Sequence, residues 1–75
     1  MEPYKNLGGN SAVIAYEMGN DFIKVQFRDG WTYTYNDESA GHNNIEHMKT
    51  LASAGSGLNS FISTVVKEQY VSKSR

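Results

Sequence analysis

The fold is decided by residues 22–35, which read FIKVQFRDGWTYTY. From Ile23 to Phe27 apolar residues alternate with polar ones, and this period of two is typical of a half-buried strand. An Asp-Gly pair at 29–30 follows, which is a strong short-range hairpin signal. Residues 31–35 alternate aromatic residues with threonines, and both types favour strands. The stretch therefore predicts two antiparallel strands joined by a tight turn.

One more strand is expected before this hairpin. Residues 12–16 read AVIAY and are apolar on both faces of a strand. Gly19 and Asn20 tolerate positive φ and predict the turn that follows it. The three segments together predict an antiparallel meander. Which face of the 31–35 strand meets the apolar face of the 22–27 strand depends on the register, which the sequence leaves open.

Two amphipathic helices are expected after the strands. Asn43 with Glu46 resembles a capping box at the start of the first helix, and glycines at 55 and 57 end it. The second helix is expected over residues 58–70, where apolar residues recur at helical spacing. The predicted fold class is α+β: a three-stranded antiparallel meander followed by two helices packed on one face of the sheet, in the order β-β-β-α-α.

The length allows a single domain. We expect residues 1–10 to be a flexible lead-in, residues 11–70 the folded domain, and residues 71–75 a frayed tail. The chain is 39% hydrophobic and 20% charged, which is typical of a globular protein and not of a disordered one. It has no cysteine, so we expect packing to hold the domain together in a reducing compartment, the cytoplasm. No membrane contact is expected, because the longest apolar run, 12–16, is far shorter than the ~20 residues a bilayer span requires.

The formal net charge is −1. Proteins that bind nucleic acid mainly through phosphates usually carry a basic surplus, because release of counterions supplies the affinity. The balance found here argues against a strong non-specific nucleic-acid binder and leaves room for a local basic patch.

Short motifs along the chain occur in an order that resembles the KTSC domain. They are Ser11, Ile14, Tyr16, Ile23-x-Val25-x-Phe27, Gly30, Tyr33-x-Tyr35, Ser53-x-Gly55 and Asn59-x-x-Ile62. The KTSC domain is a short module found at the C-terminus of some lysyl-tRNA synthetases and as a stand-alone bacterial or viral protein. This chain departs from it at 36–38, where the family has a Val-Pro, and at Leu58, where the family tends to have an aromatic residue. The resemblance implies the family's fold over residues 11–70 and, as suggested for the family, RNA binding.

The aromatic residues Trp31, Tyr33 and Tyr35 are the sharpest candidates for a ligand-binding site. Exposed aromatic rings on a sheet stack on nucleic-acid bases, each stack contributing about 1–3 kcal/mol. The other interpretation is that these rings pack under the helices, because a small domain needs large apolar surface for its core. Both interpretations stay open on the sequence.

Two further groups of residues are candidates for holding an anion. Lys24 and Arg28 are expected on a polar sheet face with neighbouring threonines, where they either bind phosphate or are simply solvated. Ser56 and Gly57 precede the second helix, so free N–H groups there either hold an anion or belong to an ordinary turn between helices.

No catalytic or metal-binding residues are predicted. None of the serines sits in a nucleophile-elbow pattern, and no convergent nucleophile, base and oxyanion donor can be assigned. His42 and His47 are five residues apart, which does not align two ligands on one helix face, and a third ligand is lacking. We expect no cofactor and no enzymatic activity.

The function expected from the sequence is that of a small binding module for RNA or a nucleotide, acting through the aromatic strand and the Lys24 and Arg28 face. The alternative is a protein–protein interaction or inhibitor protein with a mildly acidic surface, for example a virus-encoded protein that blocks a host defence or nucleic-acid-handling complex. The oligomeric state stays open, because a three-stranded sheet leaves two edges through which a homodimer can form.

Overall fold

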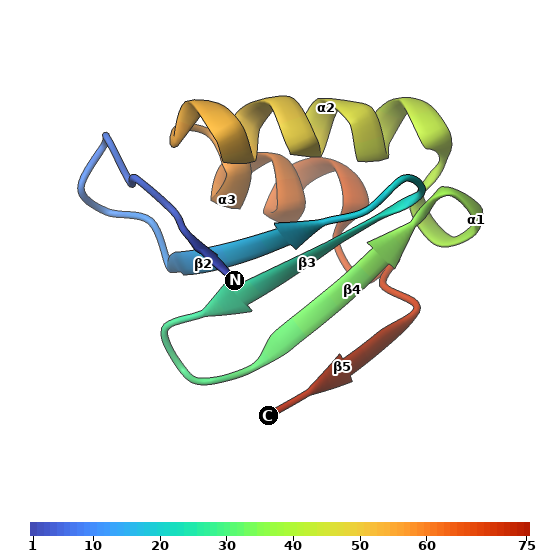
Figure 1. The fold of residues 1–75 in the computed structure, drawn as a ribbon, viewed down its shortest axis with the longest axis horizontal. Helices are drawn as coiled ribbons and strands as arrows, with labels where there is room; N and C mark the ends of the chain where they lie inside the picture. Colours follow the sequence, from blue (N-terminus) through green and yellow to red (C-terminus); the bar gives the residue numbers. More distant parts are fainter.

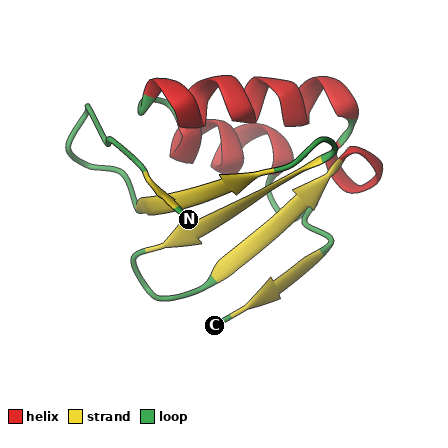
Figure 2. Cartoon of the chain, viewed as in Figure 1, coloured by secondary structure: helices red, strands yellow, loops and turns green.

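The computed structural model describes residues 1–75 and has an α+β architecture. A five-stranded antiparallel sheet has the order β1-β2-β3-β4-β5, so every strand pairs with its neighbours in the sequence. The helices α2 and α3 lie together on one side of this sheet, and the one-turn helix α1 lies at the end of β4 (Figure 1). Figure 2 shows the same arrangement coloured by secondary structure. The expected α+β class is therefore confirmed, but the sheet has five strands instead of the predicted three, and a short helix, α1, precedes the two predicted helices.

The three central strands are the predicted meander: β2 (Val13–Met18), β3 (Phe22–Phe27) and β4 (Thr32–Asn36). The connection from β3 to β4 is tight, because the Gly30 N–H donates to the Phe27 carbonyl at 3.0 Å. Gly30 takes a φ of 93°, a region that favours glycine. The Asp29 side chain accepts a hydrogen bond from the Trp31 N–H at 3.0 Å. The Asp-Gly pair thus fixes the turn.

The pairing of β3 with β4 settles the register. Ile23 lies opposite Tyr35, and Val25 lies opposite Tyr33. Residues opposite each other in an antiparallel pair share a face, so both tyrosines lie on the helix-covered face. Lys24 lies opposite Thr34 and belongs to the other, open face.

Both ends of the chain differ from the expectation. Residues expected to be a flexible lead-in include β1 (Glu2–Pro3), which pairs with β2, and residues expected to be a frayed tail form β5 (Ser72–Ser74), which pairs with β4. Segments of only two and three residues, Glu-Pro and Ser-Lys-Ser, are too short to show the alternation by which strands are recognised. The two sheet edges predicted to be free are therefore partly covered by the chain itself.

The first helical elements begin elsewhere than predicted. A one-turn helix, α1 (Asp37–Ala40), has the capping box, formed between Asn36 and Ser39. The long helix α2 (His42–Ala54) starts after Gly41, so Asn43 lies inside its first turn and is not its cap. Helix α2 ends as expected at Gly55, whose φ of 77° is the left-handed conformation of a helix C-terminus.

The second predicted helix is shorter than expected. It comprises α3 (Leu58–Phe61) and a π-helical segment, η1 (Ile62–Val66), and ends there instead of at Tyr70. The chain reverses at Lys67 and returns as β5. The apolar spacing at 58–66 therefore indicated the helix correctly, whereas Tyr70 belongs to the returning segment.

The core lies between the sheet and the helices. Its fully buried side chains include Ile23, Val25 and Tyr35 from the sheet, with Ile45, Met48, Leu58 and Val66 from the helices. Tyr4 is also buried, which places the N-terminal segment in the core cluster. No helix of the structure has the length and apolar character needed to cross a membrane.

Candidate functional site

A groove of about 470 Å³ opens beside the helix layer, where β4 meets the chain that follows η1. Its lining comes from the end of β3, from β4, from the last helical turns and from the returning segment before and within β5. The lining residues are Ala12, Phe27, Arg28, Asp29, Tyr33, Tyr35, Asn59, Ile62, Ser63, Lys67, Glu68, Tyr70 and Lys73. This volume falls within the range of small-molecule sites.

Four aromatic rings form one wall of this groove. The Tyr33 ring packs edge-on against Phe27, with centroids 5.4 Å apart, and against Tyr70, with centroids 4.9 Å apart. Tyr70 also lies 6.3 Å from Tyr35. Tyr35 is 1% exposed, whereas Tyr33 and Tyr70 are half-buried and present ring surface to the groove. The site thus has an apolar wall whose inner side is continuous with the core.

The position of Tyr35 changes its acidity. Burial, with smaller contributions from neighbouring Tyr33 and Tyr70, raises the pKa of Tyr35 to about 12. The buried environment disfavours the charged phenolate. Tyr35 therefore stays a neutral phenol well into the alkaline range.

Cations surround the aromatic wall. Arg28, Lys67 and Lys73 line the groove, and Arg75 lies just beyond it. The Lys73 Nζ lies 5.1 Å from the Trp31 ring centroid and 5.8 Å from that of Tyr70, and the Arg75 Cζ lies 4.9 Å from that of Trp31. These distances are within the reach of cation–π attraction.

None of these cations has a carboxylate partner. The chain's two ion pairs lie elsewhere, at His42 with Asp37 and at Lys49 with Glu46. The groove does contain two acidic residues, Asp29 and Glu68. The Asp29 carboxylate accepts a hydrogen bond from the Trp31 N–H, and the backbone carbonyl of Asp29 accepts one from Arg75. Four of the chain's seven lysines and arginines are thus gathered at this one place.

The structure divides the aromatic residues singled out in the sequence between core and groove. Tyr35 belongs to the core, and Tyr33 forms part of the groove wall while packing against the core. Trp31 is half-buried under Lys73 and Arg75 and does not line the groove itself. Tyr35 is therefore a core residue, whereas Tyr33 and Trp31 keep part of their side chains exposed.

The basic residues singled out in the sequence are separated from one another. Lys24 lies on the open face beside Thr34, on the opposite side of the sheet from the tyrosines. Arg28 follows β3 and reaches the groove, where one guanidinium nitrogen donates to the Ser11 carbonyl at 3.3 Å. The alternating pattern of β3 suggested a common face, but Arg28 lies beyond the strand, where the alternation no longer fixes direction.

Ser56 and Gly57 line a second, smaller pocket of about 200 Å³ between the N-terminal segment and the start of α3. The Leu58 N–H at that helix start donates to the Tyr4 hydroxyl at 3.3 Å, so this donor is already used within the chain. Asn59 is the only residue that lines both pockets. Ser56 and Gly57 are thus outside the aromatic groove.

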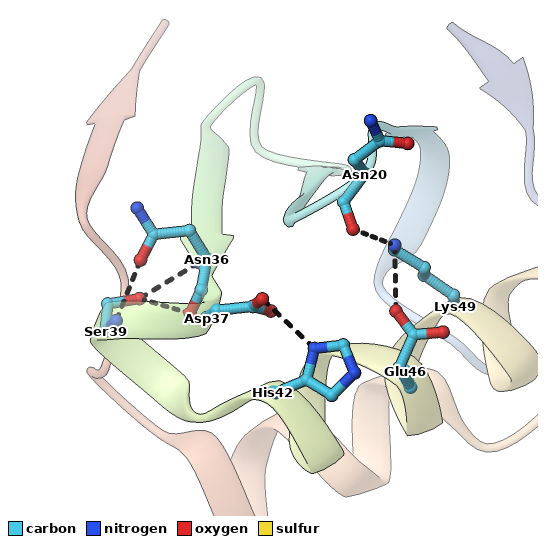
Figure 3. A network of polar contacts seen from close by, with 7 residues as sticks. All are labelled: Asn20, Asn36, Asp37, Ser39, His42, Glu46 and Lys49. Atoms are coloured by element: carbon cyan, nitrogen blue, oxygen red, sulfur yellow. Dashed lines mark hydrogen bonds and ion pairs between the residues drawn. The ribbon is translucent and has the colours of Figure 1, made fainter.

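His42 and His47 contact different partners. His42 Nδ1 lies 3.0 Å from the Asp37 carboxylate, and Lys49 bridges the Glu46 carboxylate and the Asn20 carbonyl (Figure 3). His47 packs instead against Phe61, with ring centroids 4.7 Å apart. The structure contains no group of three metal-ligating side chains.

Sequence reasoning missed Lys67, Tyr70 and Lys73 as site residues. Lys67 and Tyr70 fall within the helix expected over residues 58–70, and Lys73 falls within the expected tail, because nothing in the local sequence pattern indicates the reversal at Lys67. Arg75 was missed for the same reason. The one feature of the sequence that could have indicated these site residues is the local density of basic residues around Tyr70.

No protein-family model, curated protein or solved structure matches the chain.

Proposed function

We propose that this protein is a small non-enzymatic binding module that takes single-stranded RNA or a nucleotide in the aromatic groove. The observation that carries the proposal is the meeting of a partly exposed aromatic wall with four cations that lack carboxylate partners. A nucleotide joins a flat base to a phosphate, so it complements both features at once.

The wall supplies the base contact. Tyr33 and Tyr70 are half-buried, so their rings are held in place while part of their surface remains accessible. Stacking of a base on an aromatic side chain contributes about 1–3 kcal/mol and tolerates any base. This favours recognition of single-stranded nucleic acid with little sequence preference.

The cations supply the phosphate contact. Lysine and arginine without acidic partners gain the most from an arriving phosphate, because no existing ion pair has to be broken. Because the net charge of the chain is −1, its surface as a whole offers little general attraction for phosphate. The expected affinity is therefore modest and falls as salt is added.

We include in the same proposal that the chain is related to the KTSC domain. This rests on the ordered residues quoted above. The RNA-binding role suggested for that family agrees with the composition of the groove. Lys24, Ser56 and Gly57 are left out of the proposed site because they lie away from the aromatic wall.

The proposal is tested by titrating a fluorescently labelled short oligouridylate with the protein, first at low salt and then at increasing salt. We expect saturable binding that weakens with salt. Tyr70→Leu should weaken binding by roughly 5- to 150-fold, the equivalent of one lost stack. The matched control is Tyr16→Leu, which changes a half-buried tyrosine of β2 outside the groove. Absence of binding at low salt ends the RNA and nucleotide proposal, and binding of a protein with a basic groove in its place would support the interaction or inhibitor alternative.

A further inference from the structure

Lys67 has a backbone conformation that is unusual for a lysine. Its φ is 47° and its ψ is −114°. The Gln69 N–H donates to the Val66 carbonyl at 2.8 Å, so residues 66–69 form a β-turn with Lys67 in the second position. These angles are those of a type II′ turn, in which that position is normally a glycine. Lysine is therefore strained here, since its Cβ disfavours positive φ.

A second rare conformation comes immediately before it. In η1 the Lys67 N–H donates to the Ile62 carbonyl, five residues earlier, at 2.6 Å. Such π-helical turns are uncommon and occur frequently at functional sites. The two features together end the helix and turn the chain back, and this brings the Tyr70 ring to 4.9 Å from Tyr33. The unusual backbone is thus located where the groove is built.

The other non-glycine residue with positive φ, Asn6, is of a different kind. Asparagine tolerates the left-handed region because its short polar side chain makes local hydrogen bonds, and the Asn6 side chain accepts one from the Ser11 N–H. Lys67 is exposed and its side chain has no hydrogen bond or ion pair within the chain that would offset the strain.

We propose that Lys67 is a phosphate-binding residue that occupies a glycine position, so that its ammonium group lines the groove at the expense of fold stability. This inference rests on the proposed function and assigns one of its phosphate contacts to Lys67. Glycine at this position would relieve the strained turn and would remove the cation. Stability and affinity should therefore change in opposite directions.

The test compares three variants of the full chain with the wild type: Lys67→Gly, Lys67→Ala and Lys67→Arg. Thermal unfolding and binding of labelled oligouridylate across a salt series are measured for each. Lys67→Gly should raise the unfolding midpoint by several degrees, because the relieved strain exceeds the added flexibility of the unfolded chain. Lys67→Ala keeps a Cβ in the strained turn and should unfold at a lower temperature than Lys67→Gly.

The binding results of the two uncharged variants should agree. Both should bind RNA roughly two- to fivefold more weakly at low salt. The slope of log K against log salt should become shallower by about 0.7, the value for one lost phosphate contact on a single strand. Lys67→Arg should keep the slope. The matched control, Lys24→Ala, removes a charge from the opposite face of the sheet and should leave the slope unchanged.

The failure of this inference differs from that of the proposed function. If the wild type binds RNA and Lys67→Gly keeps the wild-type slope, or if Lys67→Gly is less stable than Lys67→Ala, the assignment of Lys67 is overturned while the groove proposal stands. If the wild type binds no RNA at low salt, the proposed function fails first and the phosphate role of Lys67 fails with it.

Discussion

The hydroxyl of Tyr4 accepts a hydrogen bond of 3.3 Å from the backbone N–H of Leu58, 54 residues later in the chain. Both residues are buried, Tyr4 at 7% exposure and Leu58 fully. The contact joins the N-terminal segment to the first turn of α3. It supplies a partner for one of the N–H groups that every helix start leaves free.

We predict that Tyr4→Phe destabilises the fold by about 1–3 kcal/mol, because a buried backbone donor loses its partner while the ring packing is kept. Denaturant unfolding with an unchanged m-value measures this. The control is Tyr16→Phe, whose hydroxyl has no hydrogen bond in the structure and which should unfold close to the wild type. Equal stability of the two variants would show that the Tyr4 hydroxyl does not support α3.

The two glycines that flank Ser56 should respond differently to alanine. Gly55 and Gly57 both have left-handed φ values, 77° and 84°. A Cβ on Gly55 would lie 2.5 Å from the Lys5 Cβ, whereas one on Gly57 would meet only the Leu51 side chain at 3.5 Å. Gly57→Ala should destabilise by about 1–2 kcal/mol from backbone strain alone. Gly55→Ala should destabilise by more, because the N-terminal segment must also move. The opposite ranking in denaturant unfolding would contradict the placement of Lys5.

The stability of the fold should fall in strongly alkaline solution because of Tyr35. The pKa of Tyr35 is raised to about 12 in the folded protein, against about 10 in an unfolded chain. The contribution of the neutral phenol is therefore complete below about pH 10 and is lost as the pH rises to about 12. Unfolding free energies across this range should decline less in Tyr35→Phe than in the wild type. Parallel declines would show that Tyr35 is not responsible.

The cations Lys73, on β5, and Arg75, directly after it, should matter more for binding than equal charges elsewhere. The double variant Lys73→Ala with Arg75→Ala removes both cations that lie over Trp31. We expect its RNA affinity to fall and its salt slope to become shallower by up to about 1.4, two contacts of about 0.7 each. The double variant Lys5→Ala with Lys24→Ala has the same net charge and should bind like the wild type. Equal losses in both would indicate non-specific attraction.

The sequence predicted those strands, turns and helices whose patterns depend only on residues close together in the chain. The alternation of 22–27, the Asp-Gly turn and the helical spacing from Leu58 to Val66 each reflect interactions within a few residues. The register of β3 against β4 could not be predicted, because a shift of one residue exchanges the two faces. For this reason the sequence could not decide whether Tyr35 lies in the core.

The groove depends on contacts between distant parts of the chain. Tyr70 reaches Tyr33 only because the helix ends at Val66 and the chain reverses at Lys67, a residue type that does not favour positive φ. Strand β5 has three polar residues and exists because β4 offers it an edge. Arg28 was singled out from the sequence, but its place in the groove and that of the later basic residues follow from this reversal.

Binding of RNA in the aromatic groove can be located by an NMR titration of the isotope-labelled protein with a short oligouridylate at low salt. We predict that the largest changes in amide and aromatic chemical shift occur at Tyr33, Tyr70 and Lys73, while the shifts of Lys24 and Thr34 on the opposite face do not change. Shift changes centred on Lys24 and Thr34, or no changes at any concentration of RNA, would contradict it.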